Sequence, residues 1–186
     1  FDSGAKAKVK VPMMSNTDYF KYVESADAQV LEMGYRGAQV AMTVVLPRAK
    51  DGLAKLEATL TPAVLGGWLD KLATTQVHVQ LPRFKIESSF ELGKTLQELG
   101  MTDAFTGGKA DFSGMDGSRD LVIGGVVQKT FCAVDEDGTE AAAATAVVMR
   151  ATSAPIGPPK DFVADHPFLF LIRDTKTGSV LFMGRV

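Results

Sequence analysis

The stretch that decides the fold reads DEDGTEAAAATAV, at residues 135–147. It begins with acidic residues and a glycine and continues with small, mostly uncharged side chains. Because alanine is the best helix former, composition alone favours a helix over 140–144. However, the β-branched residues that follow and the strand-like pattern of 121–134 before it favour an extended chain. A proline-free segment of such small residues is one that a sheet could admit as an additional strand.

The segment around this stretch is unusually long for a loop. Residues 135–159 contain no clear helix or strand pattern and end in the proline-rich run PIGPP, at 155–159. A long segment of this kind within a compact domain is usually a functional loop or a linker. We therefore expect the function of the protein to reside between residues 135 and 159, with Gly138 as the pivot.

The rest of the chain is dominated by strand-like patterns. Thr61 followed by Pro62 predicts a helix start, and Ser88 with Glu91 has the spacing of a capping box before a helix that stops at Gly100. We expect these helices to pack on sheets, and a bend or an edge position at Pro82. Alternating or apolar runs predict strands at 19–23, 28–33, 38–46, 76–86, 167–172 and 179–183.

Composition excludes several classes of protein. The 20 Lys and Arg residues nearly balance 22 Asp and Glu residues, and the net charge of −2 provides no basic field for nucleic acid. No apolar run approaches the roughly 18 residues of a membrane span. Hydrophobic residues make up 46% of the chain, which is enough for a core, and Cys132 is the single cysteine, so no internal disulfide can form.

Three separated motifs are similar to those of one family. Residues 135–145 closely resemble the hinge of the reactive-centre loop of serpins, the serine protease inhibitor superfamily. Residues 165–173 and 181–186 resemble the closing strand pair of that family, and residues 9–14 resemble its mid-chain motif. The three motifs occur in the family's order, which makes chance agreement implausible.

The resemblance implies an α+β serpin fold of mainly antiparallel sheets with a few packed helices and a long exposed reactive-centre loop. A complete serpin is roughly twice as long as this chain. Residues 1–186 are therefore expected to be the C-terminal half of a single serpin domain, with the hinge and loop at 135–159. The N-terminal half, absent from this chain, would then be a necessary partner.

The resemblance also implies a mechanism and its residues. A target serine protease would attack the loop as a substrate and form an acyl-enzyme, and the cut loop would insert into the main sheet with the protease still attached. The protein would be an inhibitor rather than an enzyme, with no cofactor and no metal. The expected hinge comprises Glu136, Gly138, Thr139, Glu140, Ala141, Ala142, Ala143, Ala144 and Thr145.

One reactive bond is expected, at either of two positions. Family spacing from Glu136 places the cut between Thr152 and Ser153, which favours elastase-like or subtilisin-like proteases. The alternative lies between Arg150 and Ala151, because arginine suits the pocket of a trypsin-like protease. The resemblance further implies an extracellular or secreted protein or, for a prokaryotic one, a periplasmic or cell-surface location.

Other functions remain as alternatives. The chain could belong to a non-inhibitory serpin-fold binding or chaperone protein, although the small hinge residues favour an inhibitor. It could also act as an isolated half that forms polymers by strand exchange. A nucleophile pair of Cys132 with His78 or His166 is a weaker interpretation than a buried, inert thiol. The acids at 135–137 and 140 lack the spacing of a calcium loop.

Overall fold

The computed structural model describes residues 1, 9–136, 138–139 and 157–186. These residues form two compact units. The first combines Phe1–Phe84 with Ala133–Val186, and the second is Lys85–Cys132. The first unit contains both ends of the chain, so its sheet is built from strands far apart in the sequence.

The first unit is built on a mixed sheet that has seven strands among the described residues. Its order is β10-β9-β3-β2-β1-β4-β8, and every neighbouring pair is antiparallel except β4 and β8, which are parallel. The strands are β1 (Met13–Glu24), β2 (Ala28–Gly34), β3 (Val40–Pro47), β4 (Ala73–Pro82), β8 (Lys160–Val163), β9 (Leu169–Asp174) and β10 (Val180–Arg185). The strands predicted at 28–33 and 38–46 are present and pair as the antiparallel hairpin β2–β3, and the expected closing strand pair is β9–β10.

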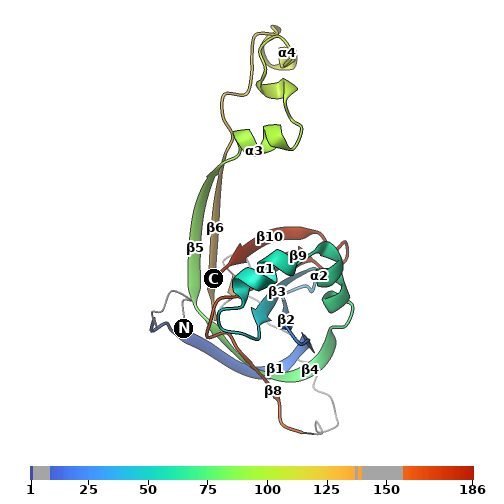
Figure 1. Ribbon diagram of the computed structural model, residues 1–186, viewed down its shortest axis with the longest axis vertical. Helices are drawn as coiled ribbons and strands as arrows, with labels where there is room; N and C mark the ends of the chain where they lie inside the picture. Colours follow the sequence, from blue (N-terminus) through green and yellow to red (C-terminus); the bar gives the residue numbers. More distant parts are fainter. Residues whose placement is uncertain (2–8, 137, 140–156) are drawn as a thin grey trace. The chain divides into compact units, whose positions relative to one another are not determined.

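The core of this unit surrounds β3, the strand with the most continuous apolar sequence. Residues 41–47 are all buried, as expected for a strand with a neighbour on each side and covered faces. The helices α1 (Leu53–Thr59) and α2 (Pro62–Leu69) lie over this part of the sheet (Figure 1). Leu56 of α1 is buried with Val30 and Val45, and Leu65 and Trp68 of α2 pack against the same cluster.

The start of α2 follows the sequence prediction. Thr61 is the N-cap, and its side-chain oxygen accepts a hydrogen bond from the backbone N–H of Val64 at 3.2 Å. Pro62 occupies the first turn, where its missing N–H costs nothing. Helix α1, in contrast, was not predicted. Its N-cap is Gly52, which has no side chain that could cap the helix and signal its start.

The second unit consists of most of β5 (Phe84–Glu91) and β6 (Val127–Asp135) with short helices at one end (Figure 1). The helices are α3 (Gly93–Glu98), the 3₁₀ helix η1 (Asp103–Phe105) and α4 (Ser113–Asp116). Gly100 follows the end of α3 as expected, with a φ of +104° that favours glycine.

The predicted capping box of Ser88 and Glu91 is wrong. Both residues lie in β5, and the helix begins only at Gly93. Glu91 nevertheless caps the backbone in another way, because its Oε1 accepts hydrogen bonds from the N–H of Gly93 at 2.9 Å and of Val126 at 3.2 Å. The strand pattern predicted for 121–134 is correct only from Val127 onward.

The strand pattern is interrupted next to Pro82, as the sequence predicted, since β4 ends there and β5 begins at Phe84. The alternative edge position also fits Pro82 itself, because Pro82 pairs with Met13 of β1 while β8 pairs only with residues 77–80 of β4. Among the described residues, no helix has the length and apolar character needed to cross a membrane.

Candidate functional site: the hinge and its supports

The described part of the predicted hinge forms a short antiparallel pairing. Strand β6 ends at Asp135, and β7 (Gly138–Thr139) returns beside it, with Val134 opposite Thr139 and Asp135 opposite Gly138. The chain therefore reverses direction after Asp135, in the part of the sequence where Gly138 was expected to act as a pivot. The extended backbone of β7 agrees with the strand interpretation of this segment.

An ion pair holds the base of this turn. The Nη2 of Arg83 lies 2.5 Å from the Oε1 of Glu136, and both side chains are about half exposed, at 52%. The hydrogen bond from Arg83 lowers the pKa of the Glu136 carboxyl below its usual range. Arg83 is itself positioned by the backbone, because its N–H donates to the carbonyl of Pro12 at 3.0 Å.

The sequence analysis did not identify Arg83 as a site residue. Its position between the last residue of β4 and the first residue of β5 was the available signal. A charged residue directly after a proline that interrupts a strand pattern marks the end of that strand and is a candidate for a side-chain contact outside it. Its partner is 53 residues away in the sequence, so the pairing itself could be seen only in the structure.

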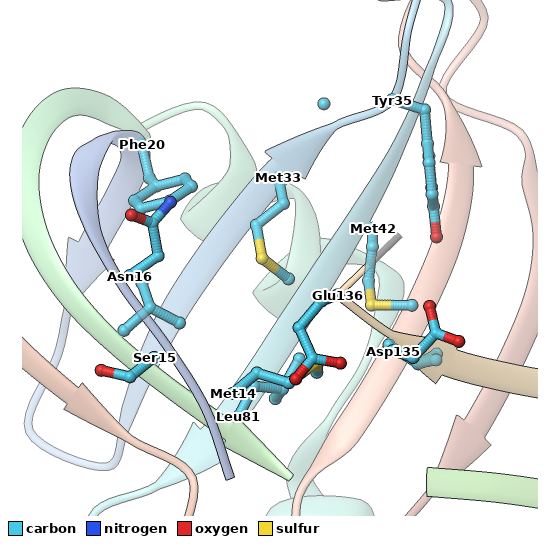
Figure 2. Close-up of a pocket in the computed structure, with 13 residues that line it drawn as sticks. Met14, Ser15, Asn16, Phe20, Met33, Tyr35, Met42, Leu81, Asp135 and Glu136 are labelled. Carbon is cyan, nitrogen blue, oxygen red and sulfur yellow. The ribbon is translucent and has the colours of Figure 1, made fainter. Parts of the chain in front are cut away.

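A cavity of about 410 Å³ lies beside the hinge turn and is lined mainly by apolar side chains. Met14 of β1, Met33 of β2 and Met42 of β3 line it, together with Val134, Asp135 and Glu136 from the end of β6. Figure 2 shows these methionines and the two carboxylates around the same space. Asp135 and Glu136 thus lie at an adaptable apolar surface, since methionine side chains fill irregular gaps easily.

The far end of the loop re-enters the sheet at β8. Lys160 to Val163 pair in parallel with Val77 to Gln80 of β4, and the side chain of Phe162 is fully buried. β8 is the edge strand of the sheet and only four residues long. The loop is therefore anchored at both described ends by backbone pairing, at β7 on one side and at β8 on the other.

Most of the predicted site residues lie outside the described residues. Glu136 and the backbone of Gly138 and Thr139 are described. The others are Glu140, Ala141, Ala142, Ala143, Ala144, Thr145, Arg150, Ala151, Thr152 and Ser153. The structure brings Glu136 together with Arg83, and the roles of the remaining residues stay predictions from the sequence.

The weaker interpretation of Cys132 as a nucleophile has no support in its surroundings. The thiol is buried, and this burial raises its pKa, whereas an activated cysteine needs a lowered one. The two histidines have other partners: His78 contacts Asp161 and Ser15, and His166 contacts Asp165 and the carbonyl of Pro47.

Comparison with known proteins identifies the class. The serpin (serine protease inhibitor) family model matches residues 1–186, which is the whole chain. The chain belongs to the serpin family, and the α+β serpin fold inferred from three motifs is confirmed. The crystal structure of Serpin48, a highly specific serpin of the insect Tenebrio molitor, matches with a TM-score of 0.77 and 40% identity. That match covers 98% of this chain and 47% of the other.

The sequence relatives are inhibitors and serpins by name. Leukocyte elastase inhibitor A of Rattus norvegicus is 45% identical, over 96% of this chain and 48% of its own length. Serpin B3 of Homo sapiens is 49% identical, over 90% of this chain and 43% of its own length. The chain thus spans about half the length of the relatives that it matches.

The relatives also correct one expectation. The predicted extracellular or secreted location is contradicted, because the relatives include leukocyte elastase inhibitors of Rattus norvegicus, Mus musculus and Homo sapiens. These proteins belong to clade B, an intracellular group of serpins. The expectation came from the family as a whole, and nothing in the residues of this chain distinguished a secreted member from clade B.

Proposed function

We propose that this chain carries the inhibitory half of a serpin that traps serine proteases as a suicide substrate. The observation that carries the proposal is the hinge: a run of small residues leaves the turn that Arg83 and Glu136 hold, and its first two residues already pair as a strand. Small side chains can enter a sheet at little steric cost, which insertion requires. The names of the elastase-inhibitor relatives support the same function.

The chemistry takes place in the target protease. Its serine Oγ attacks the carbonyl carbon of Thr152 and gives its proton to the protease's histidine; the bond to the nitrogen of Ser153 breaks, and Ser153 takes up that proton and leaves as a new amino terminus. The protease remains esterified to Thr152. Residues 138–145 then insert into the main sheet of the complete serpin. This insertion carries the attached protease away from the original loop position before water can hydrolyse the ester. Cleavage between Arg150 and Ala151 would follow the same steps with a trypsin-like protease.

We further propose that residues 1–186 act together with the N-terminal half of the same serpin. The chain matches about half the length of its relatives, and four consecutive apolar residues of β10 are solvent-exposed in the described structure. Val180, Leu181, Phe182 and Met183 have exposed fractions of 44–61%. Successive strand residues point to opposite faces, so both faces at this edge of the sheet carry exposed apolar side chains, which favours an interface there.

The test is to mix the complete protein, including any sequence that precedes residue 1, with an elastase-like and a trypsin-like serine protease. Denaturing gels detect a covalent complex, and mass spectrometry identifies the released C-terminal peptide. We expect a detergent-stable complex and a peptide that begins at Ser153; one beginning at Ala151 assigns the bond to Arg150. A protease with a blocked active-site serine is the control.

Clean cleavage without a complex would contradict inhibition and would support the non-inhibitory binding or chaperone alternative. Size-exclusion chromatography of residues 1–186 alone tests the role of the other half. We expect association or aggregation through the exposed β10 surface, whereas a well-behaved monomer would count against a missing partner half.

A further inference from the structure

The first two residues of β8 are held by an unusual concentration of polar contacts. The Nζ of Lys160 lies 2.8 Å from the Oε1 of Glu24, at the end of β1. The Oε2 of the same carboxylate lies 2.6 Å from the Nη2 of Arg48, so Glu24 is shared between two cations. These bonds to Lys160 and Arg48 lower the pKa of Glu24 to about 2, and the carboxylate stays charged well below neutral pH.

The next residue, Asp161, is held from two sides. Its backbone carbonyl accepts a hydrogen bond from the Nε2 of Gln29 at 2.9 Å, and Gln29 also donates to the hydroxyl of buried Tyr22 at 2.7 Å. The Asp161 carboxylate lies 3.1 Å from the Nδ1 of His78, whose Nε2 lies 3.2 Å from the Oγ of Ser15. Strands β1, β2 and β4 therefore all contribute a side chain to the first two residues of β8.

The contacts run from Ser15 through His78 to Asp161, as they do in a hydrolase triad. However, the exposure of the Asp161 carboxylate favours a role in anchoring β8. The Asp161 side chain is 75% exposed, whereas the carboxylate of a triad is buried and orients its histidine. Here water weakens the electrostatic interaction between Asp161 and His78. The ring of His78 can donate from Nδ1 and accept at Nε2, so it links β8 to β4 and β1 through two hydrogen bonds.

We propose that Glu24, Gln29 and His78, named here the β8 clasp, are positioning residues that fix the point at which the reactive-centre loop ends. This inference rests on the proposed inhibitory function. An edge strand of four residues with one neighbour frays at its ends with free energies near zero. Each contact is weak at the surface, but together they hold Lys160 and Asp161 on the sheet.

The functional consequence concerns presentation of the loop. If residues 160 and 161 detach, the free chain becomes longer and the protease meets a wider set of loop positions. Holding the end of the loop in place reduces the conformational freedom lost on docking. The clasp should therefore increase the rate at which the protease engages the loop, without changing which bond is cut.

Hydrogen exchange in the complete protein tests the clasp directly. Glu24→Gln and His78→Leu should each accelerate amide exchange in peptides covering 157–163 by about fivefold, and the double variant by more. Glu57→Gln is the matched control, because Glu57 pairs with Arg185 of β10 and not with β8. Lys160→Arg keeps a cation near Glu24 and should leave exchange unchanged.

The rate of complex formation with the target protease is the second readout. The clasp variants should form the complex two- to fivefold more slowly, with the same cleavage site and unchanged exchange in β3. Unchanged exchange in 157–163 would overturn the clasp, and faster exchange with an unchanged rate would overturn its positioning role. If the unmodified protein forms no complex, the inhibitory function fails, while exchange still decides whether the clasp exists.

Discussion

The Nη2 of Arg83, the residue between β4 and β5, lies 2.5 Å from the Oε1 of Glu136, the first residue of the expected hinge. This pair ties the first residue of the expected hinge to the break between β4 and β5. Because both side chains are about half exposed, water screens their attraction, and the pair acts mainly by position. It also places the Glu136 carboxylate at the methionine-lined cavity.

Removal of the guanidinium should change the titration of its partner. Arg83 lowers the pKa of Glu136, so the stabilisation from the pair is present above the usual carboxyl pKa and is lost as pH falls through the lowered value. In Arg83→Met the pKa of Glu136 should rise towards its usual range. Carbon-detected NMR titration of the labelled carboxyl measures it, with Arg83→Lys as the control that keeps a cation. An unchanged pKa would contradict the pairing.

Thr139→Arg should convert the proposed inhibitor into a plain substrate. A long, charged side chain cannot enter a sheet interior without a large desolvation cost, whereas cleavage of the loop does not depend on insertion. We expect the covalent complex to disappear from denaturing gels while the loop is still cut. Thr139→Ser keeps a small hydroxyl and should retain the complex. Persistent complexes in Thr139→Arg would contradict the insertion mechanism.

The stabilisation from Glu24 should depend on pH in a defined direction. Its hydrogen bonds to Lys160 and Arg48 lower its pKa to about 2, so this stabilisation is complete above the ordinary carboxyl pKa and disappears as pH falls towards 2. The difference in unfolding free energy between the unmodified protein and Glu24→Gln should be constant from about pH 7 to pH 5. It should shrink below about pH 4, as urea denaturation can measure. A difference that grows on acidification would disprove this assignment.

Gly184→Ala should destabilise the β9–β10 pair. A Cβ at residue 184 would lie 2.6 Å from ring atoms of Phe170, whose side chain is buried and cannot move aside easily. Overpacking of this kind costs about 1–3 kcal/mol. Thermal or urea unfolding measures the loss. In the control Gly67→Ala, in α2, nothing lies within 4 Å of the new Cβ, and helix propensity should make it neutral or stabilising. Equal losses in both variants would contradict the steric argument.

Phe162→Ala should test the apolar anchor of β8. The side chain is fully buried at the centre of the four-residue strand, and truncation of a buried phenylalanine costs about 3–5 kcal/mol. The clasp variants, which change surface contacts, should cost much less. Denaturant unfolding of Phe162→Ala beside Glu24→Gln separates the two contributions. A loss in Phe162→Ala no larger than that in Glu24→Gln would show that burial does not anchor β8.

Local patterns predicted those elements whose causes are local. The cap of α2 needs only Thr61 and Pro62, and the run of β3 signals burial because nearly all of its side chains are apolar. Ser88 and Glu91 show the limit of such patterns. Their spacing suits a helix start, but pairing in the β5–β6 sheet extends the strand to Glu91. Sheet pairing depends on distant residues and overrides a local signal of about 1 kcal/mol.

The sequence by itself determined the family and the small-residue composition of 138–145, and it predicts the loop and the hinge there, because side-chain size and motif order are properties of the chain alone. Only the tertiary structure decided which residues support the loop. Arg83 reaches Glu136, Glu24 reaches Lys160, and His166 reaches the carbonyl of Pro47 across 53, 136 and 119 residues, respectively. Such contacts arise when sheet register brings distant segments together, and no local pattern encodes which side chains will then lie opposite each other.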